Sequence, residues 1–249
     1  MCKEVTVNFK DVSKSYVLNT YMSSGFKNML LHLSRRPGTL RHKNVVHALH
    51  RVSFEVFKGE SLGIIGRNGS GKSTILGLIA GVLKPSSGIV QVTGRISPLL
   101  ELGAGFHPEL SGTDNIMLNG VLLGMTKQQV KGKIERIVEF SGLGDFVREP
   151  LRTYSTGMVA RLGFSVVVHV DPQILLIDEV LAVGDEEFQK KCLAEMEAFR
   201  SRGVTIVFVS HDLASVERLC DSVALIDKGE LIDLAEPAKV IAKYRARLH

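Results

Sequence analysis

The sequence predicts an α/β fold in which a buried parallel sheet carries polar residues at the carboxyl ends of its strands. Three short apolar segments support this prediction: 61–65, 173–179 and 204–209. The first is followed by a glycine-rich loop, the second ends in two acidic residues, and the third is followed by Ser-His-Asp. Short apolar runs of this kind are typical of parallel strands that are buried on both faces. Because ligands bind beyond the carboxyl ends of such strands, the residues that follow the three segments are the candidate site.

The segment after 61–65 is a complete phosphate-binding loop. Residues 66–73 read Gly-Arg-Asn-Gly-Ser-Gly-Lys-Ser, the pattern G-x-x-x-x-G-K-S, and residues 74–80 are expected to begin a helix. The glycines let backbone N–H groups surround the phosphates, the helix N-terminus adds a partial positive charge, and Lys72 adds a full one. The motif predicts a nucleoside triphosphate ligand, with Ser73 holding Mg²⁺. The residues assigned to nucleotide binding are Gly66, Asn68, Gly69, Ser70, Gly71, Lys72, Ser73 and Thr74.

The second apolar segment ends in Asp178 and Glu179. A carboxylate at the carboxyl edge of a parallel sheet lies beside the phosphate loop, so Asp178 is expected to complete the Mg²⁺ shell. Glu179 follows at the exit of the strand and is placed to polarise a water molecule for attack on the γ-phosphorus. The pair therefore predicts hydrolysis of the triphosphate, with Glu179 as the general base.

Two further polar elements add candidate residues. The third segment continues into Ser-His-Asp, and His211 at that rim can reach the γ-phosphate. Earlier in the chain, Ser155-Thr156-Gly157-Met158 precedes an apolar stretch, 159–168, that is expected to form a buried helix. A small polar residue and a glycine at a helix N-terminus make a second anion site.

Composition excludes several other classes of protein. A chain of 249 residues with 45% hydrophobic residues can bury a large core, and it is neither disordered nor fibrous. Three cysteines without a C-x-x-C pair argue against a disulfide framework or a zinc site and favour a reducing cytosol. No apolar run is long enough to cross a bilayer, and the N-terminus lacks the apolar region of a signal peptide. We therefore expect a chain that does not span a membrane by itself.

A basic segment precedes the phosphate loop. Residues 12–54 contain no acidic residue, although the formal net charge of the whole chain is only +5. Within this stretch, apolar residues at helical spacing predict a short basic amphipathic helix: Phe26, Met29, Leu30 and Leu33. Such a helix either packs on its own domain with a solvated basic face or contacts an anionic neighbour, such as phospholipid or nucleic acid.

The order of these motifs resembles that of the ATP-binding subunits of ABC transporters, and the likeness covers nearly the whole chain. The resemblance implies that ATP and Mg²⁺ are the cofactors and that Tyr16 is the aromatic platform for adenine. It also implies that Ser155, Thr156, Gly157 and Met158 form the signature that contacts a nucleotide held by a partner subunit. Asp185 matches the loop that communicates across the dimer. The implied partners are a second copy of the chain and a dimeric transmembrane permease.

Departures from the common pattern narrow the resemblance to bacterial polysaccharide exporters, which transport O-antigen, teichoic acid or capsule. These departures are the S-T-G-M signature, the loop at 97–108, the segment Glu139–Leu143 and the basic insertion. The resemblance implies export of a lipid-linked polysaccharide, with the subunit bound peripherally at the cytoplasmic face of the bacterial inner membrane. Glu101 is the match for the family's metal-linked glutamine, although a shift by one residue would place Leu102 there.

The implied architecture is a single nucleotide-binding domain over residues 1–249, with a P-loop NTPase core of ABC type. Alternating residues at Val5–Phe9 and Val52–Val56 predict an antiparallel β layer beside the core. We expect the core at about 1–105 and 170–235, a helical signature lobe at about 106–169, the basic insertion at about 20–44, and a C-terminal helix at about 237–249. Longer members of the O-antigen group carry a carbohydrate-binding module beyond that helix, so a short subunit, a separate recognition step or a fragment all remain open.

Two rival classes share some of these motifs. A soluble ABC-type ATPase acting on nucleic acid or ribosomes would explain the basic stretch, but such proteins usually have coiled-coil heptads or tandem ATPase units, which this sequence lacks. A P-loop kinase or small GTPase needs neither the signature at Ser155 and Gly157 nor His211. We therefore expect no nucleic-acid partner.

Overall fold

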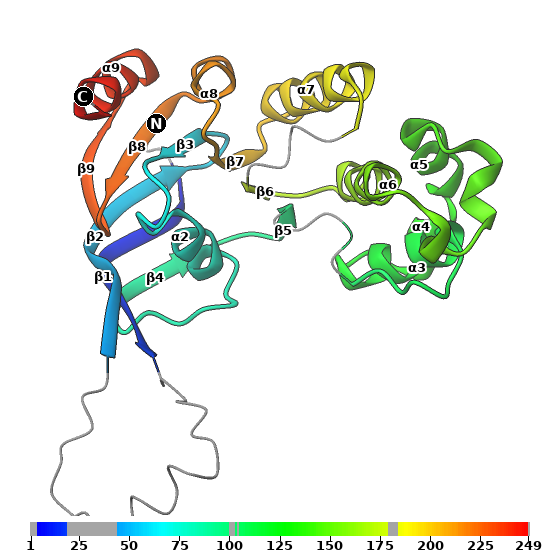
Figure 1. Cartoon of the computed structure of the whole chain (residues 1–249), viewed down its shortest axis with the longest axis horizontal. Helices are drawn as coiled ribbons and strands as arrows, with labels where there is room; N and C mark the ends of the chain where they lie inside the picture. Colours follow the sequence, from blue (N-terminus) through cyan, green and yellow to red (C-terminus); the bar gives the residue numbers. More distant parts are fainter. Residues whose placement is uncertain (1–3, 19–43, 100–102, 104, 179–183, 249) are drawn as a thin grey trace, which may run out of the picture.

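The protein contains a six-stranded sheet that is parallel except at one edge. The computed structural model describes residues 4–18, 44–99, 103, 105–178 and 184–248 (Figure 1). Within this part of the chain, neighbouring strands of β5 to β8 run parallel and β9 is antiparallel to β8. The strand order is β5 (Ile96–Leu99), β6 (Ile174–Asp178), β7 (Thr205–Val209), β3 (Ser61–Ile65), β8 (Ser222–Asp227) and β9 (Glu230–Ala235). The three predicted strands thus lie next to one another in the sheet.

A second sheet of three strands covers one face of the first. It has the order β2 (Asn44–Phe57), β1 (Val5–Leu18) and β4 (Ser87–Val92), and all its pairings are antiparallel. The core between the sheets includes Phe9 and Phe54, whose rings stack with centroids 4.5 Å apart, and the helix α2 (Lys72–Ile79). The predicted antiparallel layer is confirmed, and β1 and β2 extend well beyond the alternating segments that indicated them.

Three helices pack on the opposite face of the parallel sheet, and they are α7 (Glu186–Ser201), α8 (Leu213–Leu219) and α9 (Pro237–Leu248). Their apolar residues share one core cluster with the strands; Phe188, Met196, Val216 and Val240 are all buried there. The strands β3 and β7 are buried along their whole length because both faces of the sheet are covered. This double covering explains why the strands read as continuous apolar runs.

A helical lobe extends from the sheet on the side of β5 and β6 (Figure 1). It has its own apolar cluster, which includes Ile116, Val130, Ile137 and Leu162. Its elements are α3 (Gly112–Leu122), α4 (Lys127–Lys131), α5 (Ile134–Ser141), the 3-10 turns η2 (Gly144–Arg148) and η3 (Leu151–Thr153), and α6 (Thr156–Val168). Together, the two sheets and this lobe confirm the predicted fold class.

Some sequence-based predictions lie outside the described residues. These are the amphipathic helix within 19–43 and the roles of Glu101 and Glu179. Among the helices in the described ranges, none is both long and apolar enough to cross a bilayer.

Candidate functional site

The phosphate loop joins the end of β3 to the start of α2, and two of its glycines are required by close backbone contacts. Gly66 has φ 154° and Gly71 has φ 109°. A Cβ at Gly66 would lie 2.1 Å from the carbonyl oxygen of Ile226, and one at Gly71 would lie 2.6 Å from that of Ala48. Because no side chain fits at either position, the loop is held closely against the end of β8 and against β2.

Lys72 begins α2 and is 8% exposed. Its Nζ donates hydrogen bonds to the carbonyl oxygens of Gly66 at 2.9 Å and Arg67 at 3.1 Å. An ammonium group has three donors, so these two bonds fix its position and leave a third for a ligand. The N-cap of α2 is Gly71, which has no side chain with which to satisfy the first backbone N–H groups of the helix. The start of α2 is therefore suited to an anion.

The strand order brings the other candidate residues to the same edge of the sheet. Val209 at the end of β7 pairs in register with Asp178 of β6 on one side and with Ile64 of β3 on the other. The carboxyl ends of the three strands are therefore level. His211 follows β7 by two residues and is exposed at this edge.

The loop that carries His211 is fixed by its neighbours. Asp212 accepts a hydrogen bond from the backbone N–H of Ala214 at 3.1 Å and caps α8. Its own N–H donates to Oγ of Ser210 at 3.0 Å. A hydrogen bond from the Ser215 hydroxyl is the main reason why the pKa of the Asp212 carboxyl is lowered. Asp212 therefore remains an anionic helix cap at neutral pH.

A cleft of about 460 Å³ joins the loop to the acidic strand end, and it is lined by Ala48, Asn68, Gly69, Gly71, Lys72, Ser73, Thr74 and Asp178. The structure thus brings together six of the predicted loop residues and Asp178. The residues fit both expected ligands: Lys72 and the start of α2 suit phosphates, while the Ser73 hydroxyl and the Asp178 carboxylate are oxygen ligands of the kind that Mg²⁺ prefers.

Tyr16 does not line this cleft, but it lies along the strand pair that leads to it. Tyr16 on β1 pairs with Val46 on β2, and Ala48, two residues further along β2, lines the cleft. The Tyr16 ring is partly exposed, with the Nζ of Lys14 5.1 Å from its centroid. Its role as a platform for the base stays a prediction.

The four signature residues lie at the N-terminus of α6, on the helical lobe. Ser155 caps this helix by accepting a hydrogen bond from the Met158 N–H at 3.2 Å. Thr156 is exposed, and a Cβ at Gly157 would meet only Oγ of Ser155 within 4 Å. These residues do not line the phosphate-loop cleft of their own chain. A single subunit therefore has both elements, but it does not bring them together.

Asp185 connects α6 with α7. Its Oδ1 accepts the N–H of Phe188 at 2.9 Å and caps α7, and its Oδ2 lies 3.3 Å from Nη1 of Arg161 on α6. The Arg161 guanidinium also lies over the Phe188 ring, 5.0 Å from its centroid. Asp185 thus makes an intramolecular contact in this structure, and its role across a dimer stays a prediction.

Sequence reasoning missed the residues that support the loop from outside the motif. Ala48 lies on β2, far from the motif in sequence and without chemical character of its own. A second cleft, of about 410 Å³, lies along the loop and is lined on its other side by Lys228, Tyr244 and Arg247. Only the folded chain brings these residues to the loop, so no local pattern could have indicated them.

The fold and the site together define a nucleotide-binding cassette. The sequence profile of the ABC transporter family matches residues 49–182, and the chain belongs to this family. Two solved structures share the fold. An ATP-binding subunit of an ABC transporter has a TM-score of 0.75 at 20% identity and covers 97% of this chain and 94% of its own. A dimeric ATP-binding cassette bound to ADP and phosphate has a TM-score of 0.72 at 20% identity and covers 93% of this chain and 98% of its own.

Curated relatives are similar over almost the whole chain. An O-antigen export system ATP-binding protein, RfbB, from Klebsiella pneumoniae is 49% identical over 97% of this chain and 98% of its own length. RfbB from Myxococcus xanthus is 51% identical over 95% of this chain and 54% of its own length. The teichoic acids export ATP-binding protein TagH from Bacillus cereus is 42% identical over 98% of this chain and 43% of its own length.

Proposed function

We propose that this chain is the ATP-hydrolysing subunit that powers export of a lipid-linked polysaccharide across the bacterial cytoplasmic membrane. The observation that carries the ATPase assignment is the cleft in which Lys72, Ser73 and Asp178 meet. Similarity to O-antigen and teichoic-acid export subunits supports the cargo class. The alternative of an ATPase acting on nucleic acid has no support among these relatives.

The described residues divide the work of binding. Lys72 and the backbone N–H groups at the start of α2 would hold the β- and γ-phosphates, with the loop backbone fixed by the contacts at Gly66 and Gly71. Ser73 and Asp178 would hold Mg²⁺, which supplies charge neutralisation at the phosphates when it is bound. Tyr16 would stack on the adenine ring.

Hydrolysis would be carried out by Glu179 and His211. Glu179 would accept the proton of the attacking water, because it follows Asp178 directly. His211 would contact the γ-phosphate from the end of β7, the strand between Asp178 and the phosphate loop. The level carboxyl ends of β6, β7 and β3 support this proposal.

Two kinds of partner complete the proposal. A second copy of the chain would supply Ser155 to Met158 to the nucleotide held by the first, which fits a signature that does not line its own cleft. A dimeric permease would dock near residues 105–110, between core and lobe, next to apolar side chains of α3 that are exposed: Leu118, Val121 and Leu122. The subunit would then lie at the cytoplasmic face of the inner membrane.

The test compares ATPase activity with two possible stimulants: a detergent-solubilised transmembrane permease, and nucleic acid. We expect stimulation by the permease only. Lys72→Ala should abolish hydrolysis, because it removes the fixed charge of the cleft, whereas Lys84→Ala, at an exposed lysine outside the cleft, should leave it unchanged. Stimulation by nucleic acid alone would reject the export function, and full activity of Lys72→Ala would reject the site.

A further inference from the structure

We propose that Lys133, Asp171 and Arg95 form a polar clamp that fixes the helical lobe on the core and thereby positions the N-terminus of α6. The proposal rests on the proposed function, because it makes these three residues positioning residues for the signature, Ser155 to Met158. None of the three lines the phosphate-loop cleft. Their effect on hydrolysis would therefore be exerted through α6.

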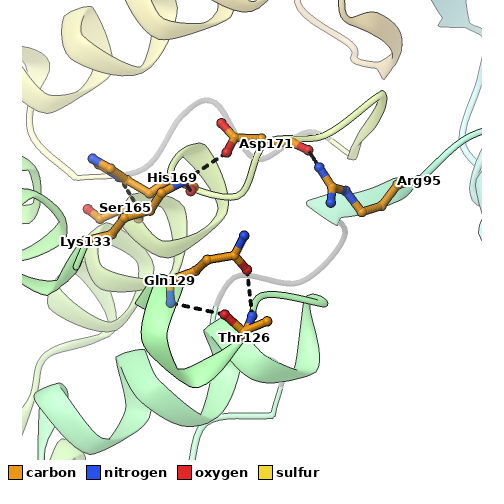
Figure 2. A network of polar contacts seen from close by, with 7 residues as sticks. All are labelled: Arg95, Thr126, Gln129, Lys133, Ser165, His169 and Asp171. Atoms are coloured by element: carbon orange, nitrogen blue, oxygen red, sulfur yellow. Dashed lines mark hydrogen bonds and ion pairs between the residues drawn. The ribbon is translucent and has the colours of Figure 1, made fainter. Parts of the chain in front are cut away.

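The lobe half of the clamp is Lys133, the N-cap residue of α5 (Figure 2). Its Nζ donates to the carbonyl oxygen of His169 at 2.7 Å and to Oδ2 of Asp171 at 3.0 Å. His169 is the C-cap of α6, and Nδ1 of its ring lies 2.7 Å from the carbonyl oxygen of Ser165. A cation at a helix C-terminus interacts favourably with the helix dipole and with the last carbonyl groups. Lys133 thus holds the end of α6 that is opposite the signature.

The core half is Arg95, which precedes β5. Its guanidinium donates to the carbonyl oxygen of Asp171 (Figure 2). The Arg95 backbone is fixed to the start of β6, because its N–H donates to Oε1 of Gln173 at 2.7 Å and its carbonyl accepts from Ile174 at 3.0 Å. Asp171 lies where the chain returns from α6 to β6, and it is therefore bound on one side by the lobe and on the other by the core.

The length of α6 amplifies any movement at the clamp. Thirteen residues separate the capped C-terminus from Ser155, and at 1.5 Å per residue the helix is about 20 Å long. A tilt of about 10° at the clamp would move the signature by about 3 Å, and a misplacement of about 1 Å is enough to slow an enzymatic reaction strongly. The side chains of Lys133 and Asp171 are 26% and 82% exposed, so the ion pair contributes little to global stability. Loss of the clamp should therefore affect catalysis more than folding.

The lobe offers two matched controls. Thr126 and Gln129 form a capping box at the start of α4, and Thr126→Ala would break this box without touching a contact between lobe and core (Figure 2). Lys131 is the last residue of α4 and is exposed. Lys131→Met therefore removes one positive charge, as Lys133→Met does, but at a site outside the clamp.

The first measurement compares two quantities in each variant: kcat for ATP hydrolysis and the Kd for ADP. We expect Lys133→Met to lower kcat by about 3- to 30-fold, as for other losses of positioning, while the ADP Kd and the melting temperature stay close to wild type. Lys133→Arg keeps a cation with several donors and should recover most of the rate, and both controls should keep the wild-type kcat, although Thr126→Ala should lower the melting temperature because it removes a helix cap. An unchanged kcat in Lys133→Met, or an equal loss in Lys131→Met, would overturn the clamp.

The second measurement does not depend on ATPase activity. Spin labels at Glu139→Cys on α5 and Glu55→Cys on β2, both exposed positions, report the distance between lobe and core in a Cys2→Ser chain. Burial raises the pKa of the Cys192 and Cys220 thiols to about 12, so neither competes for the label. The distance distribution should widen in Lys133→Met but not in Lys131→Met. An unaltered distribution would reject the clamp, whereas widening in a chain without any ATPase activity would support the clamp and reject the proposed function.

Discussion

At the residue scale, the consecutive carboxylates Asp178 and Glu179 are expected to divide the work of hydrolysis. Asp178 lines the cleft beside Ser73, and Glu179 is the next residue in the chain. We predict that Glu179→Gln retains ATP binding but hydrolyses ATP about 10²- to 10⁴-fold more slowly, because an amide cannot accept the proton of the attacking water. Nucleotide titration and single-turnover hydrolysis measure the two properties separately. Glu217→Gln, at an exposed carboxylate of α8, is the control.

Near-normal hydrolysis in Glu179→Gln would assign the general base to another residue. Loss of ATP binding in the same variant would instead indicate that the side chain is required for the structure of the site.

The phosphate loop shows why some residues can be predicted from sequence and others cannot. Its helix start, its glycines and Lys72 are contiguous, so a local pattern contains all of their chemistry. The backbone groups that make Gly66 and Gly71 necessary belong to Ile226 and Ala48, which come from distant parts of the chain. The sequence could therefore predict that the loop binds phosphate, but not which strands hold it in place.

At the element scale, α3 depends on an asparagine that the sequence does not distinguish from a surface residue. Asn115 is fully buried; its Oδ1 accepts the N–H of His107 at 2.7 Å, and its Nδ2 lies within 3.1 Å of the carbonyl oxygens of His107, Leu110 and Ser111. These contacts attach the segment that enters the lobe to the first turns of α3. A polar residue inside a helix usually indicates a solvated face, so only the fold reveals this role.

We predict that Asn115→Leu destabilises the protein by about 2–4 kcal/mol, because the buried side chain would no longer bond the His107 N–H and the carbonyl oxygens of His107, Leu110 and Ser111. Chemical denaturation measures the free energy of unfolding directly. Gln91→Leu, at an exposed position of the edge strand β4, serves as the control for the added apolar surface. A change of less than about 0.5 kcal/mol, the usual effect of a surface substitution, would show that the network does not stabilise the lobe.

At the scale of the whole molecule, the strand order brings the carboxyl ends of three strands together, and the lobe carries the predicted signature elsewhere. In the order β6-β7-β3, the carboxyl ends of three strands that are separate in the sequence lie level at one edge of the sheet. Apolar runs ending in polar residues predict that each strand is buried and parallel, but they do not specify this order. The N-terminus of α6 lies on a body with its own apolar cluster and does not line the cleft. A complete site therefore requires a second copy of the chain in the proposed function.

This arrangement predicts nucleotide-dependent dimerisation. The chain should be a monomer without nucleotide, and Glu179→Gln with ATP should form a stable dimer, because ATP binds across the interface and is not consumed. Light scattering after gel filtration measures the mass, and Lys72→Ala combined with Glu179→Gln should remain a monomer.

Mixing Lys72→Ala subunits with Gly157→Asp subunits then tests the assignment in trans. A mixed dimer keeps one site with both elements intact if the signature acts on the partner's nucleotide, so activity should rise above that of either variant alone. If no activity returns although mixed dimers form, the signature acts within its own chain.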